Sequence, residues 1–266
     1  MRTETPAQVT RVTQTGALPA RDRVVVEEPL EIRLNGKALS VTMRTPGADE
    51  ELALGFLWSE RIVTSLDEVR SIRGPLGPPG GTHVEVEVDE TAVTRRRWTR
   101  SFASTSSCGI CGIESLDMIT VHGRVDALEG EPRIERRLLF TLPARMRGAQ
   151  EVFGLTGGLH AAALFAPTGE LLAIREDIGR HNALDKLIGW AVRTPDLDRA
   201  RSVLLVSGRL SFELTAKALA LGVPILAAVS APSSLAVEVG LQHGMTIIGF
   251  LRDESANIYA GEERVA

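Results

Sequence analysis

The sequence has little cysteine, few aromatic residues and no strong excess of charge. Only two of its 266 residues are cysteine, too few for a disulfide framework in a chain of this length. Aromatic residues make up 4%, which argues against the stacking surfaces that bind single-stranded nucleic acid. The net charge of -4 gives no overall attraction to nucleic acid or anionic membranes. We therefore expect neither as a partner, and any basic site must be local.

Long apolar segments are also missing. The longest apolar stretch, around residues 223–229, is far shorter than the ~20 residues that a membrane-spanning helix needs. Residues 1–12 are polar and lack the apolar core of a signal peptide. We therefore expect a soluble, cytoplasmic protein whose two thiols stay reduced and available for chemistry.

The first part of the chain is predicted to be of the α+β class. Residues 1–22 show no periodicity and are expected to form a flexible tail ahead of a domain over residues 23–137. Two alternating segments, 30–34 and 39–43, flank Asn35-Gly36, which favours a type I′ turn and so a β-hairpin. The pattern also predicts a helix over 49–58 and a strand over 84–88.

The second part, residues 138–266, alternates strands with helices and is predicted to be α/β. Continuous apolar strands between amphipathic helices indicate a mostly parallel sheet covered on both faces. The expected strands are 161–165, 171–176, 203–207, 224–229 and 246–251, and the expected helices are 178–192, 211–221 and 234–241.

Cys108 and Cys111 are the two cysteines, in the run Thr105-Ser106-Ser107-Cys108-Gly109-Ile110-Cys111-Gly112. A zinc site needs three or four protein ligands, and the nearest downstream histidine is His122. A redox couple is a second interpretation. The third is a nucleophilic thiol on a glycine-rich loop, ahead of a predicted helix over 113–121 whose N-terminus would favour thiolate. Such a loop suits sulfur transfer between large partners, and the basic run Arg95-Arg96-Arg97 precedes it.

Three further segments place polar side chains where predicted strands end, the usual ligand edge of an α/β sheet. Arg180 and His181 fall in the first turn of a predicted helix, where anions bind. Arg209 follows a glycine turn and is a candidate phosphate ligand. The last strand ends in the turn Phe250-Leu251-Arg252-Asp253-Glu254-Ser255. Neither a P-loop nor a G-x-G-x-x-G fingerprint is present, so nucleotide hydrolysis and dinucleotide hydride transfer are not supported.

Taken together, these segments resemble the FdhD family, the accessory sulfurtransferases of formate dehydrogenases. The resemblance extends from about residue 27 to residue 252. It is carried by Met43-Arg44-Thr45-Pro46-Gly47 with Glu50-Glu51-Leu52-Ala53-Leu54-Gly55-Phe56, by residues 106–112, by Thr156-Gly157-Gly158-Leu159-His160-Ala161-Ala162, by Arg175-Glu176-Asp177-Ile178-Gly179-Arg180-His181-Asn182-Ala183 and by Ser207-Gly208-Arg209.

The resemblance implies a sulfur carrier. It would take persulfide sulfur from a cysteine desulfurase and pass it to a molybdenum (or tungsten) bis-guanine-dinucleotide cofactor before that cofactor enters formate dehydrogenase apoenzyme. The cofactor would be a bound substrate, with no permanently bound metal. Cys108 would carry the persulfide, Cys111 would assist, and Phe250, Leu251, Arg252, Asp253, Glu254 and Ser255 would form part of the cofactor surface, near Arg180, His181 and Arg209.

The resemblance also implies that the second part has a cytidine-deaminase-like fold without its zinc site. His160 is followed by Ala161-Ala162, and no cysteine follows Cys111, so the deaminase signature is missing. Two other functions stay open: a non-catalytic cofactor chaperone whose thiols only grip the metal or a partner, and a dithiol oxidoreductase. The oligomeric state is also open, and a homodimer is one candidate.

Overall fold

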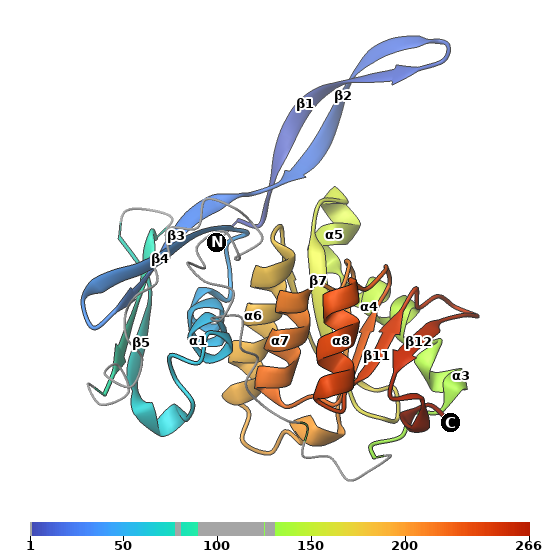
Figure 1. Ribbon diagram of the computed structural model, residues 1–266. Helices are drawn as coiled ribbons and strands as arrows, with labels where there is room; N and C mark the ends of the chain where they lie inside the picture. The colour runs from blue at the N-terminus through green and yellow to red at the C-terminus, as the bar shows by residue number, and fades with distance from the viewer. Residues whose placement is uncertain (1, 78–80, 90–124, 126–130) are drawn as a thin grey trace.

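The computed structural model describes residues 2–77, 81–89, 125 and 131–266, which form three β-sheets and two layers of helices around the largest sheet (Figure 1). Cys108, Cys111, His122, the arginine run at 95–97 and the predicted helix over 113–121 lie outside the described residues.

A two-stranded hairpin precedes the rest of the fold. Strands β1 (Glu4–Thr13) and β2 (Gly16–Val25) pair antiparallel along their whole length. The prediction that residues 1–22 lack regular structure is therefore wrong. The sequence pattern missed these strands because they project from the body of the molecule (Figure 1). No core imposes an apolar period on strands whose side chains are mostly exposed.

The next sheet contains the predicted hairpin. Its strands are β3 (Glu28–Leu34), β4 (Lys37–Arg44), β5 (Val69–Leu76) and β6 (His83–Val88), in the order β4-β3-β6-β5. The turn between β3 and β4 is confirmed, since Asn35 and Gly36 both have positive φ. Helix α1 (Asp49–Ser59), also predicted, packs Leu52 and Leu57 against the apolar face of this sheet.

The largest sheet has the strand order β12-β11-β10-β9-β7-β8. Strands β9, β10 and β11 are parallel, but β7 is antiparallel to both β8 and β9, and β12 is antiparallel to β11. The prediction of a mostly parallel sheet is thus wrong, because three of its five neighbouring pairs are antiparallel. Composition does not reveal strand direction, because strands buried on both faces are apolar in either direction. The connection between β7 and β8 is short, and a short connection allows only antiparallel pairing. The strands are β7 (His160–Phe165), β8 (Leu171–Asp177), β9 (Val203–Val206), β10 (Ile225–Ala228), β11 (Thr246–Gly249) and β12 (Asn257–Ala260).

Helices cover both faces of this sheet, which confirms the three-layer arrangement. The predicted helices α6 (Arg180–Val192), α7 (Phe212–Leu221) and α8 (Ser234–Gln242) pack on one face. On the other face lie α3 (Arg136–Leu139) and α4 (Leu142–Ala149), which were not predicted. The domain boundary near residue 138 stays a prediction. The remaining helices are α5 (Glu151–Thr156) and the short 3-10 turns Leu66–Glu68, Arg199–Arg201 and Glu262–Arg264.

The two parts meet where α1 crosses α6 without side chains between the backbones. A Cβ added to Gly55 would lie 1.8 Å from the carbonyl oxygen of Asp185, and one added to Gly189 would lie 1.9 Å from that of Glu51. Glycine at both positions therefore permits the contact. Among the described residues, no helix is long and apolar enough to span a membrane.

Candidate functional site

Five segments come together at one edge of the large sheet, where β9, β10 and β11 end. Backbone hydrogen bonds join them: Ser207 N donates to Ala161 O (3.0 Å), Leu210 N to Ala231 O (3.1 Å) and Phe250 N to Ser230 O (3.1 Å). The end of β8 and the start of α6 lie beside the start of β7, since His160 pairs with Asp177. The ligand edge expected from the sequence is thus assembled from residues 157–160, 177–182, 207–210, 230–233 and 250–255.

The first turn of α6 faces the first turn of α7 across this edge. His181 Nε2 lies 2.7 Å from Glu213 Oε2, with only 17% and 15% of the two side chains exposed. Two other buried polar atoms here have no hydrogen-bond partner, Arg180 Nε and Glu213 Oε1. A buried polar atom without a partner costs about 1–3 kcal/mol. A cluster of such atoms is therefore expected where a polar ligand completes the bonding.

Glu213 was missed by sequence reasoning. It follows Ser211, which caps α7 by accepting from the backbone N–H of Leu214, and an acidic residue in a first helical turn is usual for purely structural reasons. The signal that could have identified it is its place after the same strand end as Arg209.

His160 begins β7 and also faces this edge. Its Nδ1 lies 3.4 Å from Ser207 Oγ, which itself accepts from the Ala161 N–H at 2.9 Å. Burial lowers the pKa of His160, the charges of Arg180 and His181 lower it further, and Asp177 opposes them. The imidazole is therefore neutral at neutral pH. A Cβ at Gly208 would lie 3.4 Å from its Nδ1, which places the turn after β9 in contact with the ring.

Part of the motif at 175–186 is structural. Asp177 is fully buried, and its Oδ2 accepts from Thr45 N (3.1 Å) and lies 2.7 Å from Lys186 Nζ. Its Oδ1 accepts from Gly179 N and from Asn182 Nδ2, which also donates to Met43 O (2.7 Å). These side chains hold the β4–α1 turn against the start of α6, so they position Arg180 and His181 rather than face a ligand.

The turn at 250–255 combines a core residue with exposed polar ones. Phe250 has a positive φ of 53° and is 41% exposed, whereas Leu251 is fully buried in the core. Leu251 therefore offers no exposed surface to a ligand, and its N–H already donates to Ala228 O (3.0 Å). Arg252, Asp253, Glu254 and Ser255 are exposed, as is Arg209 on the neighbouring turn. The edge thus presents two exposed guanidinium groups beside an exposed aromatic ring.

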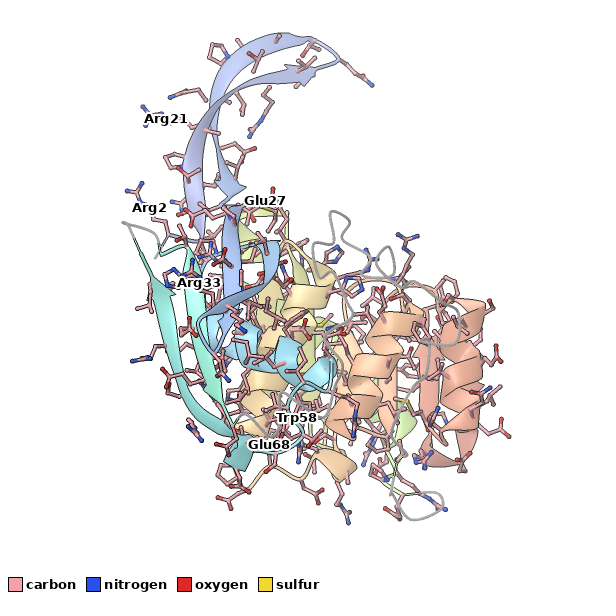
Figure 2. The ribbon with its side chains drawn as sticks, turned by 60° about the vertical axis from the view of Figure 1, so that its left-hand side comes forward. Arg2, Arg21, Glu27, Arg33, Trp58 and Glu68 are labelled. Carbon is pink, nitrogen blue, oxygen red and sulfur yellow. The ribbon has the colours of Figure 1, made fainter. Side chains whose placement is uncertain are left out.

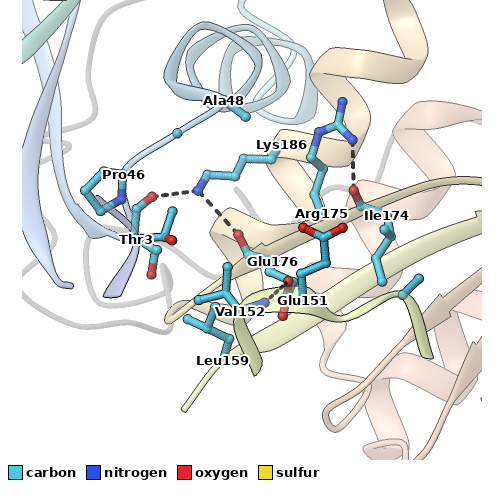
Figure 3. A pocket seen from close by; sticks show the side chains of 13 residues that line it. Thr3, Pro46, Ala48, Glu151, Val152, Leu159, Ile174, Arg175, Glu176 and Lys186 are labelled. Atoms are coloured by element: carbon cyan, nitrogen blue, oxygen red, sulfur yellow. Dashed lines mark hydrogen bonds between the residues drawn. The ribbon is translucent and has the colours of Figure 1, made fainter. Parts of the chain in front are cut away.

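A cavity of about 260 Å³ lies beside this edge, between the β4–α1 turn, α5 and β8. Lys186 Nζ donates to Thr45 O at 2.7 Å and to Glu176 O at 3.4 Å, and the carboxylate of Glu176 accepts from the N–H of Val152 (Figure 3). Arg175 pairs with Glu51. Three of the charged residues that line the cavity, Lys186, Glu176 and Arg175, are thus already paired within the protein. Among the described residues, no group of three or more His, Cys, Asp and Glu side chains is arranged to hold a metal ion.

Comparison with known proteins identifies the family. The model of the FdhD/NarQ family matches residues 25–266, which include every segment of the edge described above. The chain belongs to the FdhD/NarQ family.

Three relatives of this FdhD/NarQ chain are named sulfur carrier protein FdhD. The protein from Streptomyces avermitilis is 51% identical over 259 residues, covering 94% of this chain and 92% of its own. That from Mycolicibacterium paratuberculosis is 46% identical over 271 residues and all of both chains. That from Saccharolobus solfataricus is 40% identical over 258 residues, covering 96% of this chain and 95% of its own.

A solved structure from Desulfotalea psychrophila, which is assigned as a formate dehydrogenase accessory protein, has the same fold as this FdhD/NarQ chain. It matches with a TM-score of 0.79 over all of both chains at 21% identity. The assignments of Cys108 and Cys111 lie outside the described residues and stay predictions.

Proposed function

We propose that this protein is a sulfur carrier that sulfurates a molybdenum bis-guanine-dinucleotide cofactor before the cofactor enters formate dehydrogenase. The observation that carries the proposal is the edge cluster of Arg180, His181 and Glu213, in which Arg180 Nε and Glu213 Oε1 are buried without a hydrogen-bond partner. The names of relatives that are 40–51% identical support the sulfur-carrier part.

The edge suits a guanine nucleotide. Phosphates are favoured at the N-terminus of α6, which has no acidic residue in its first turn, and Arg209 and Arg252 add exposed positive charge. The cluster offers donors on Arg180 and His181 and an acceptor on Glu213. Guanine presents the matching groups, an O6 acceptor and an N2 donor. The cofactor is the cargo and the substrate of this site.

The sulfur relay uses the two cysteines. The thiolate of Cys108 attacks the terminal sulfur of the desulfurase persulfide, the desulfurase cysteine leaves as a thiolate, and Cys108 holds the sulfur as a persulfide. Cys111 thiolate then attacks the sulfur atom of Cys108, and the terminal sulfur leaves as sulfide to the metal. A Cys108–Cys111 disulfide remains, and a cellular dithiol must reduce it before the next turnover.

Intact-mass spectrometry tests the proposal. Wild type, Cys108→Ala and Cys111→Ala proteins are incubated with an active cysteine desulfurase and cysteine. We expect a reducible gain of about one sulfur atom that is lost only without Cys108. No gain in any variant would refute the carrier function and favour a cofactor chaperone. A normal gain in the Cys108→Ala protein would refute the assigned nucleophile.

A further inference from the structure

His160 begins β7 at the sheet edge where the five segments meet, which we call the functional edge. The function proposed for this edge leaves His160 without a task. A neutral histidine donates from one ring nitrogen and accepts at the other, and the partner of one nitrogen determines which of them carries the proton. The contacts of His160 therefore show what its second nitrogen offers to a ligand.

Ser207 determines which ring nitrogen of His160 carries the proton. Ser207 Oγ accepts the N–H of Ala161 at 2.9 Å, so its own hydrogen is the group that remains to be bonded. Among the described residues, His160 Nδ1, at 3.4 Å, is the only acceptor within hydrogen-bonding distance of that hydroxyl. Nδ1 must then present its lone pair to Ser207, and the proton of the neutral ring lies on Nε2.

The turn after β9 closes the Nδ1 side of the ring. A Cβ at Gly208 would lie 3.4 Å from Nδ1 and 3.5 Å from Cε1 of His160, and Nε2 is farther away than either atom. Within residues 2–77, 81–89, 125 and 131–266, Nε2 has no hydrogen-bond partner. The nitrogen that carries the proton is thus the one left for a ligand.

Arg180 lies against the same turn as His160. Its Cδ would lie 3.9 Å from the Cβ at Gly208, and its Nε is buried without a hydrogen-bond partner. Arg180 is also the first residue of α6, whose N-cap, Gly179, makes no side-chain cap and whose first turn has no acidic residue. N–H groups at such a helix start favour an anionic oxygen. An ionised phosphate, which offers only acceptors, matches these groups together with the Nε2–H of His160.

His160 contributes a donor here without adding positive charge. Its imidazole is neutral at neutral pH, because burial and the charges of Arg180 and His181 lower its pKa. Hydrogen bonds from neutral donors to phosphate are weaker than those from cations. His160 therefore orients a phosphate while holding it less tightly than a lysine or arginine would, which suits a cargo that must be passed on.

We propose that His160, with its proton placed on Nε2 by Ser207, donates a hydrogen bond to a phosphate oxygen of the bound nucleotide at the start of α6. His160 is then a residue that contacts the ligand, and Ser207 is a positioning residue that acts through it. The contact rests on the proposed function, because it requires a guanine nucleotide at this edge. The position of the proton does not.

NMR of the full chain, with histidine side chains labelled with nitrogen-15, tests the position of the proton without any substitution. We expect Nε2 of His160 to carry the proton at neutral pH, and its N–H signal to move when GDP is added. The His160→Gln spectrum identifies the His160 signals by their absence. In Ser207→Ala, the Nδ1 signal should move to that of a nitrogen without a hydrogen bond. A proton on Nδ1, an unmoved Nδ1 signal in Ser207→Ala, or an unmoved Nε2–H signal while GDP binds would overturn the proposal.

Calorimetry with GDP tests the contact itself. His160→Phe keeps an aromatic ring but removes the donor, and we expect it to raise the dissociation constant about fivefold to tenfold, the value of one neutral hydrogen bond. His160→Gln keeps an N–H near the position of Nε2 and should restore most of the affinity. His83→Phe is the matched control and should change nothing. His83 lies in β6, in the sheet that also carries Arg33 and that α1 separates from the large sheet (Figure 2).

The outcomes separate this contact from the proposed function. Equal GDP affinity in wild type and His160→Phe would overturn the contact and leave the nucleotide site in place. A wild type that binds no GDP would refute the nucleotide site of the proposed function and the contact together, and the position of the proton would still be decided by the NMR spectrum alone.

Discussion

Replacing Asp177 with asparagine should destabilise the protein more than any conservative change elsewhere at the functional edge. The Asp177 carboxylate is fully buried and lies 2.7 Å from Lys186 Nζ, whose side chain is 2% exposed. Asparagine removes the negative charge and leaves the ammonium buried with only carbonyl partners. Breaking a buried pair in this way costs about 3–5 kcal/mol.

The geometry also predicts an asymmetry between the two partners. Both carboxylate oxygens of Asp177 already accept from N–H groups, so asparagine would turn its NH₂ toward a donor in either orientation. In Lys186→Met, by contrast, the carboxylate keeps its three N–H donors. We expect Lys186→Met to cost less than Asp177→Asn, and the double variant to cost at least about 1 kcal/mol less than the sum.

Urea unfolding followed by circular dichroism measures these free energies. A loss of about 3–5 kcal/mol corresponds to a fall of about 1–2 M in the midpoint for a protein of this size. Additive single variants, or a cost of Asp177→Asn below about 1 kcal/mol, would refute the view that this ion pair holds the β4–α1 turn against α6.

Three further predictions concern packing, pH and ligand binding. Gly55→Ala should cost about 3 kcal/mol or more in unfolding experiments, because its Cβ would overlap a carbonyl oxygen, whereas Gly148→Ala meets open space and should be neutral or stabilising. Because the pKa of His160 is lowered in the folded state, the unfolded chain binds more protons, and stability should fall as pH drops below about 6.5. His160→Gln should flatten the slope of melting temperature against pH in thermal melts. An unchanged slope would contradict His160 as the cause. Arg209→Gln should weaken GDP binding about threefold to tenfold by calorimetry, whereas Arg137→Gln, an exposed control in α3, should leave it unchanged; equal effects would contradict a site at this edge.

Local sequence signals were sufficient for most of the fold. Asn35-Gly36 dictates its turn through backbone conformation alone, and the apolar strands β9 and β10 are recognisable because both of their faces are buried. Strand direction is a different matter, because burial on both faces gives the same composition in parallel and antiparallel strands. The β1–β2 hairpin was not predicted for the opposite reason, since most of its side chains are exposed.

The sequence predicted where strand ends would gather polar side chains, but not which side chains would contact each other there. Arg180, His181 and Arg209 follow strand ends, a position that topology alone marks as ligand-facing. The partnership of His181 with Glu213 depends on how α6 packs beside α7, which no local pattern encodes. For the same reason, the sequence does not distinguish Asp177 and Lys186, which stabilise the fold, from neighbouring residues that face the edge.

The glycine crossing of α1 and α6 has a consequence for how the molecule moves. Packed helices usually slide on a layer of side chains that change rotamer, and here the backbones meet with no such layer. Opening the two parts would break backbone contacts and the buried bonds to Asp177 together. The scaffold therefore behaves as one stiff frame. If the proposed cofactor binds at the edge, we expect the motions that admit and release it in the turns along that edge.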